Sequence, residues 1–182
     1  MHPSELRFVG GLDGIWAVEG IRAVVGDGLS TCDRVALVPA TEPLSAGAWT
    51  LRGVPGHERY TQAAEHDALK AVQPPLGRPE ASCAALIPIR KSAAWWQLSQ
   101  DQRRSILEEQ SHHIRYGMGF LPAVARRLYH SRDLGESFDF LTWFEFAPAD
   151  KPAFDELVAG LRATPEWTHV EREVEVRLVR RG

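Results

Sequence analysis

The chain has 182 residues, of which 44% are hydrophobic, so it can bury a core in one large domain or two small modules. Its net charge of -3 and pI near 6.2 argue against a nucleic-acid surface, which needs a basic stripe. No segment approaches the roughly 20 apolar residues that cross a bilayer. The first residues carry neither a basic region nor an apolar run, so we expect no signal peptide and a cytoplasmic location. We also expect that the protein binds neither nucleic acid nor a membrane.

The first half of the chain predicts three strands followed by one helix. The strands cover residues 15–25, 34–39 and 48–53, and the helix runs from about residue 57 to residue 72. The glycine pairs at residues 10–11 and 26–28 are typical of turns rather than of phosphate-binding loops. Residues 73–79 carry three prolines and one glycine and therefore predict a rigid linker. We place the boundary between two halves, residues 1–80 and 81–182, just after it.

The second half predicts the order strand, helix, strand, strand, helix, strand. Ser99 and Gln102 have the spacing of a capping box, which opens a helix, and apolar and charged residues alternate along the last strand. The elements are a strand at residues 84–90, a helix from Ser99 to about Gly117, strands at 124–130 and 139–146, a helix over 150–161, and a strand at 170–178. This order is that of a ferredoxin-like unit, in which both helices cover one face of an antiparallel sheet.

The other face of such a sheet must also be covered. The first half supplies a cover, because it resembles a ferredoxin-like unit that has lost its first helix. The fold class we predict is therefore α+β, with two ferredoxin-like halves, the N-terminal one truncated. Together they would form one continuous sheet or barrel around a shared cavity.

Two adjacent histidines near the end of the first predicted helix differ in direction. On a helical wheel, His113 lies at the edge of the apolar face that holds Ile106 and Ile114, whereas His112 points to water. Taken alone, His113 is more typical of a boundary histidine bonded to backbone than of a metal ligand. Gly117 favours the second interpretation, because a small residue lets a flat cofactor approach the backbone closely.

Arg126 interrupts an apolar strand face. With a period of two residues, it shares that face with Val124 and Leu128. Such an arginine either lies at a sheet edge and reaches solvent, or faces a cavity. A buried guanidinium needs an anionic partner, so the second alternative predicts an anion-binding pocket.

Other residues are weaker candidates, since each is also common in a structural role. Glu166 lies in a turn, tryptophans are most often core anchors, and a linker glutamine is usually solvated. A tyrosine and a lysine could bind a carboxylate. The candidates are Tyr60, Gln73, Lys91, Trp95, Trp96 and Glu166.

Several familiar sites have no motif in this sequence. We find no Ser-His-Asp motif, no P-loop, no dinucleotide fingerprint and no Cys/His cluster with zinc-ligand spacing. Cys32 and Cys83 are expected to be reduced thiols. Because Cys-x-x-Cys-His is absent, any haem would be held without a covalent bond.

Taken together, the motifs resemble the chlorite dismutase family of haem b proteins, in its short, dimeric lineage. Arg126 follows His113 by thirteen positions, the spacing that this family shows between its proximal histidine and its distal arginine. The residues that carry the resemblance are Trp95 and Trp96, His113, the run from Arg126 to His130, the strand from Asp139 to Glu145, and Glu166.

The resemblance implies a dimeric α+β barrel with haem b (iron protoporphyrin IX) in the C-terminal half. His113 would be the iron ligand, Glu166 its hydrogen-bond partner and Arg126 the distal arginine. The remaining roles are that Gln73 holds Arg126 inward, Tyr60 and Lys91 lie near the haem propionates, and Trp95 and Trp96 pack beside the haem and the subunit contact. The catalytic residues would then be Arg126, Gln73 and Glu166.

As to activity, the resemblance implies an oxidoreductase, a chlorite O2-lyase. It would convert chlorite to chloride and dioxygen through an iron-oxo intermediate and a trapped hypochlorite. The truncated first half favours a homodimer over a pentamer. One alternative is a coprohaem decarboxylase of haem synthesis, although those relatives usually lack the distal arginine. Another is a haem-binding α+β barrel without catalysis.

Overall fold

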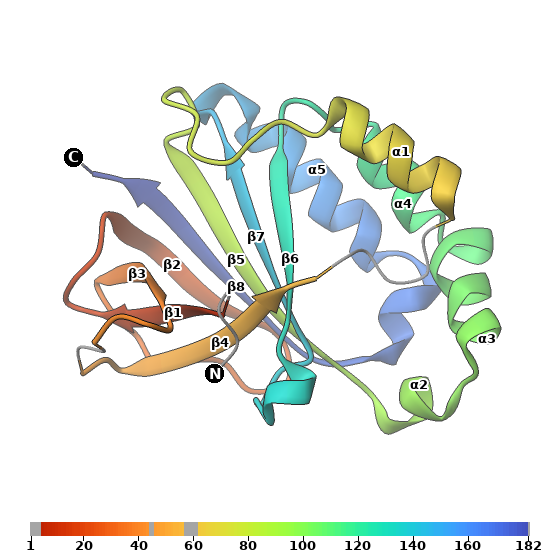
Figure 1. Ribbon diagram of the computed structural model, residues 1–182, viewed down its shortest axis with the longest axis horizontal. Coiled ribbons are helices and arrows are strands. Elements are labelled where there is room, and N and C mark those ends of the chain that lie inside the picture. The colour runs from red at the N-terminus through yellow and green to blue at the C-terminus, as the bar shows by residue number, and fades with distance from the viewer. Residues whose placement is uncertain (1–4, 44–45, 57–61, 182) are drawn as a thin grey trace.

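The computed structural model describes residues 5–43, 46–56 and 62–181. Eight strands close into a barrel in the order β1-β3-β2-β8-β5-β7-β6-β4, and all eight neighbouring pairs are antiparallel (Figure 1). The strands are β1 (Leu6–Gly11), β2 (Trp16–Val25), β3 (Arg34–Pro39), β4 (Trp49–Pro55), β5 (Cys83–Lys91), β6 (Ala125–His130), β7 (Phe140–Phe146) and β8 (Val170–Arg180).

The helices gather on one side of the barrel (Figure 1). They are α1 (Ala63–Val72), α2 (Ala93–Gln97), α3 (Gln100–Arg104), the π-helix η1 (Ser105–Gln110), α4 (His113–Met118) and α5 (Lys151–Arg162), with short 3-10 turns η2 (Arg132–Leu134), η3 (Pro148–Asp150) and η4 (Pro165–His169). In the segments that the structure describes, no helix combines the length and the apolar character that crossing a membrane requires.

The predicted α+β class and barrel are confirmed, and the second half follows the predicted order of elements. In the first half, β2 to β4 match the three predicted strands, and residues 63–72 of the predicted helix form α1. The start of that helix, residues 57–61, lies outside the described residues. The four strands of each half are neighbours in the barrel, and the boundary near residue 80 stays a prediction.

The turn predicted at residues 10–11 is wrong, because both glycines belong to β1. This strand pairs with β3 on one side and β4 on the other. Position 10 requires a glycine, because a Cβ atom there would overlap the indole ring of Trp49. A glycine has no side chain, so the two glycines add nothing to the alternation of apolar and polar side chains that indicates a strand. For this reason the sequence pattern did not predict β1.

The single helix predicted from Ser99 to about Gly117 is also wrong. Its capping box is present, but the chain passes from α3 into a π-helix and then through His112, whose φ of 51° is left-handed. Helix α4 starts afresh at His113. A helical wheel drawn through the whole segment therefore does not describe where its side chains point.

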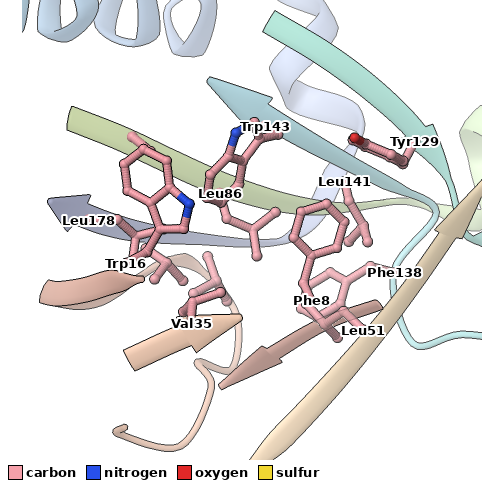
Figure 2. Packing of buried hydrophobic residues seen from close by; sticks show 13 residues of the cluster. Phe8, Trp16, Val35, Leu51, Leu86, Tyr129, Phe138, Leu141, Trp143 and Leu178 are labelled. Carbon is pink, nitrogen blue, oxygen red and sulfur yellow. The ribbon is translucent and has the colours of Figure 1, made fainter. Parts of the chain in front are cut away.

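The interior of the barrel is filled with side chains from all eight strands. Phe8 meets Tyr129 edge to face at 5.2 Å, and Trp16 meets Trp143 at 5.3 Å between ring centroids (Figure 2). Leu86 is fully buried among them. This core occupies the space in which the sequence predicted a shared cavity, so that part of the prediction is wrong.

Alternation along β5 divides its side chains between two cores. Ala84 and Leu86 point into the barrel, whereas Ile87 and Ile89 point outward to a second apolar cluster that includes Phe154 of α5. The outer face of the second-half strands is thus covered by helices, and the space between these two layers is where a site can form.

The two halves meet along two seams of unequal length. Strands β2 and β8 pair over eight positions, whereas the described parts of β4 and β6 pair at Val54–His130 and Pro55–Tyr129.

We expect Leu86→Ala to lower the free energy of unfolding by about 2–5 kcal/mol, because it opens a void in a core with no room to relax. Leu12→Ala is the matched control: Leu12 is 78% exposed, so the same change there should cost no more than about 0.5 kcal/mol. Urea unfolding followed by tryptophan fluorescence measures both. Equal losses in the two variants would contradict the assignment of Leu86 to the core.

Candidate functional site

A mostly apolar cavity lies between the outer face of the second-half strands and the helices. Its position and lining suit a large apolar ligand that is oriented by a few polar groups. The strands contribute Ile87, Ile89, Lys91, Arg126, Leu128, Phe140, Thr142 and Phe144, and the helical segments contribute Trp95, Leu107, His113, Ile114, Gly117, Phe120, Leu157, Leu161, Glu166 and Trp167, among others.

His113 presents an imidazole to this cavity from the first position of α4. Its Nδ1 lies 2.6 Å from Oε2 of Glu166, and its ring stacks on Trp167 with an interplanar angle of 19°. Because Nδ1 is bonded to the carboxylate, Nε2 is the nitrogen left to bind a metal. His113 therefore borders an apolar space, and it does so from the start of a new helix rather than from the middle of one long helix.

Glu166 is a buried carboxylate held from two sides. Its other oxygen, Oε1, accepts a hydrogen bond of 2.7 Å from Nζ of Lys91, and both side chains are about 5% exposed or less. Burial alone would raise the pKa of Glu166, but the charges and hydrogen bonds of His113 and Lys91 outweigh it and lower this pKa to about 2. The carboxylate is therefore ionised at neutral pH.

Lys91 lines the cavity from the end of β5, and its ammonium is paired inside the protein. Its ammonium lies between Glu166 and the ring of Trp95, 4.5 Å from that ring's centroid. A buried lysine already paired in this way serves to keep Glu166 charged. Nothing in the sequence separates this role from binding a propionate, because the partner is 75 residues away.

Arg126 lines the cavity together with Leu128 from β6. The period-two pattern predicted that the two share a strand face, and of the two alternatives for that face the structure has the cavity. Gln73, at the end of α1, donates a hydrogen bond from Nε2 to the backbone carbonyl of Arg126. The linker residue and the arginine are thus brought together, and the contact fixes the arginine's backbone.

The remaining candidates divide between the cavity and its surroundings. Trp95 is buried and lines the cavity. Trp96 stacks against Arg132, 3.8 Å from the ring centroid, and donates from Nε1 to Asp139. Tyr60 lies outside the described residues. Cys32 and Cys83 are free thiols, as expected.

The sequence patterns did not identify a further charged pair at the cavity, formed by Glu173 and Arg162. Glu173 is fully buried, accepts a hydrogen bond of 2.7 Å from Nε1 of Trp167, and pairs with Arg162 of α5 at 2.6 Å. The alternation of β8 put this residue on a charged face, but the pattern could not show that α5 covers that face. Arg162, in the last turn of α5, is the one sequence feature that indicates a buried acidic partner nearby.

The polar groups at this site restrict what it can hold. No group of three His, Cys, Asp or Glu side chains among the described residues could hold a metal ion by itself. A lone imidazole beside an apolar space suits a metal that brings its other ligands with a flat cofactor. Apart from its chain neighbours and the backbone of its own helix, no described atom lies within 4 Å of the position that a Cβ on Gly117 would take, so there is open space one turn after His113.

Comparison with known sequences points to one family. A family model described as Chlorite dismutase matches residues 44–181. A chlorite dismutase of Ideonella dechloratans is 41% identical over 83 residues, which are 46% of this chain and 27% of that protein. The chain thus matches about a quarter of the length of that curated relative.

Comparison with solved structures extends the likeness over nearly the whole chain. A dimeric chlorite dismutase from Nitrobacter winogradskyi is 52% identical, with a TM-score of 0.92 over 97% of this chain and 99% of that one. The chlorite dismutase of Candidatus Nitrospira defluvii in complex with imidazole is 26% identical, with a TM-score of 0.58 over 80% of this chain and 56% of that one.

We expect Glu166→Gln to destabilise the cofactor-free protein by about 3–5 kcal/mol at pH 7, because Lys91 is left buried without its counter-charge. The pKa of Glu166 is lowered in the folded state, so the ionised carboxylate stabilises the fold above its ordinary pKa of 4.5. This contribution declines as the pH falls from 4.5 toward about 2.

Urea unfolding of wild type and Glu166→Gln between pH 7 and pH 3 measures the difference, with the exposed Glu109→Gln as control. The stability difference should be constant above pH 5 and should narrow below it. A difference that does not change with pH would contradict the ionised, buried carboxylate.

Proposed function

We propose that this chain, which belongs to the chlorite dismutase family, binds haem b beside His113 and converts chlorite to chloride and dioxygen, acting as a homodimer. The proposal rests mainly on the charged and polar side chains that line one cavity. His113 and Glu166 lie on its helical side, with Lys91 joining them from the end of β5, and Arg126 lies on the strand side. The dimeric Nitrobacter relative, which matches over nearly the whole chain, supports the assembly.

The residues at the cavity fit a haem. His113 would bind the iron through Nε2, since Nδ1 is already bonded to Glu166. The apolar side chains of both layers would contact the faces of the macrocycle, and the space beside Gly117 leaves room for it. When bound, the haem would supply an iron centre able to exchange oxygen with a chlorine oxyanion.

On the histidine side, the protein controls a proton. Glu166 accepts the hydrogen bond from Nδ1 of His113 and so fixes the orientation of the imidazole, with Nε2 as the ring nitrogen left to bind the iron. Lys91 keeps the carboxylate ionised, since it donates to the opposite oxygen. Held in this way, His113 would donate electron density to the iron of a bound haem and so favour its oxidised states.

On the strand side, the protein offers a cation to an anionic substrate. Arg126 would attract chlorite into the cavity, where apolar walls weaken the competition from water. It would then hold the chlorine oxyanion until the second oxygen has been transferred. No outside reductant is needed, because chlorine gains the four electrons that the two oxygen atoms lose. Gln73 holds the backbone from which Arg126 projects.

We expect His113→Ala to weaken haem binding by at least about 100-fold, because the iron loses its protein ligand. Titration of the cofactor-free protein with haem, followed in the Soret band, measures the affinity. His112→Asn is the matched control, because asparagine tolerates the left-handed backbone of that position. Equal haem affinity in His113→Ala and wild type would rule out the ligand assignment.

We expect Arg126→Gln to lower the rate of oxygen release from chlorite by at least about tenfold, or 1.36 kcal/mol of barrier. Loss of the cation should also let hypochlorite escape, so that the variant bleaches after fewer turnovers. An oxygen electrode with haem-loaded protein measures both effects. Arg127→Gln is the matched control, because Arg127 is the next residue of β6 and is exposed.

The same experiment separates the alternatives. Arg126→Gln protein that releases oxygen at the wild-type rate and lasts as long would remove the role of the arginine. Loaded wild type that releases no oxygen would overturn the chlorite proposal. Coprohaem with peroxide, followed by loss of CO2, would then be the reaction to test.

A further inference from the structure

The segment that leads into His113 departs twice from an ordinary helix. Ser105–Gln110 form a π-helix, and His112 follows in the left-handed region with φ 51° and ψ 33°. A residue with a Cβ atom is disfavoured there, so contacts elsewhere must stabilise the turn. Single-turn π-helices are frequent at functional sites.

Glu108 provides the main contact, from within the π-helix. Its side chain is buried, with Oε2 accepting the N–H of Ile114 at 2.6 Å and Oε1 accepting the N–H of Arg115 at 3.3 Å. Its backbone carbonyl accepts the N–H of His112 at 3.0 Å. Among the described residues, His112 makes no side-chain cap of its own to α4. Glu108 therefore does for the helix that starts at His113 what an N-cap side chain normally does.

Ser111 holds the partner of His113 in the same way. Its side chain is buried, and its hydroxyl accepts the backbone N–H of Glu166 at 3.0 Å. Glu166 in turn reaches Nδ1 of His113 with its carboxylate. Glu166 is thus held at two points by residues 111–113. Its backbone N–H is bonded to the Ser111 hydroxyl, and its carboxylate is bonded to the His113 imidazole.

From these contacts we propose that Glu108 and Ser111 are positioning residues of the site. Glu108 fixes the first turn of α4 and hence the direction of the His113 imidazole. Ser111 fixes the backbone of Glu166, and hence the depth from which its carboxylate meets Nδ1. The inference rests on the proposed function, because it concerns the geometry of the residue taken there as the iron ligand.

Backbone amide exchange in the cofactor-free full chain tests the capping contact directly. In Glu108→Ala, the amides of Ile114 and Arg115 lose their acceptor and should exchange about five- to thirtyfold faster. Glu109→Ala removes the same charge from the next residue, which is exposed, and should leave both rates unchanged. Glu108→Gln keeps one acceptor oxygen and should restore part of the protection, and it carries the test if Glu108→Ala does not fold.

The iron–imidazole stretching band of the haem-loaded ferrous protein tests the consequence for the ligand. Glu108→Ala and Ser111→Ala should shift and broaden this band, because the imidazole direction and the Nδ1 hydrogen bond are less well defined. Glu109→Ala should match wild type. A purely structural role would lower thermal stability and leave the band where it is.

The outcomes separate this inference from the function on which it rests. If wild type shows no imidazole-bound iron, the proposed function fails, and the amide exchange still decides whether Glu108 caps α4. If wild type shows that band and the Glu108 and Ser111 variants match Glu109→Ala in both band and exchange, the positioning role is wrong while the proposed function stands.

Discussion

The site depends on one buried negative charge. Glu166 has to remain ionised at a depth where burial opposes it, and His113 and Lys91 together supply the compensation. Neither partner is dispensable, because removing one leaves an unpaired charge inside the protein. Three segments far apart in sequence, β5, the start of α4 and the turn η4, must therefore converge on a single carboxylate.

The barrel makes that convergence possible because its interior is full. Since Phe8, Trp16 and Trp143 occupy the inside, the only face of the second-half strands left to build on is the outer one. Helices cover that face (Figure 1). The cavity forms between the two layers. One strand can then contribute to both regions, as β6 does with Tyr129 inside and Arg126 outside.

Local patterns in the sequence predicted the strands of the second half and the face that Arg126 shares with Leu128. These features depend on spacing along one element. The break at His112, the burial of Glu173 and the pairing of Lys91 with Glu166 could not be predicted, because each depends on a partner from another part of the chain. The roles of the site residues came from family resemblance rather than from spacing.

The unequal seams of the barrel have a consequence for how it moves. Within the described residues, β4 pairs with β6 at two positions, one of them Pro55, which has no N–H to donate. Local opening should therefore begin there and leave the longer β2–β8 seam as the hinge. Such a slit would admit water to the aromatic core beside Tyr129. Strand β6 stays paired with β7 along its whole length. The part of the cavity wall that carries Arg126 should therefore keep its shape while the seam between β4 and β6 opens.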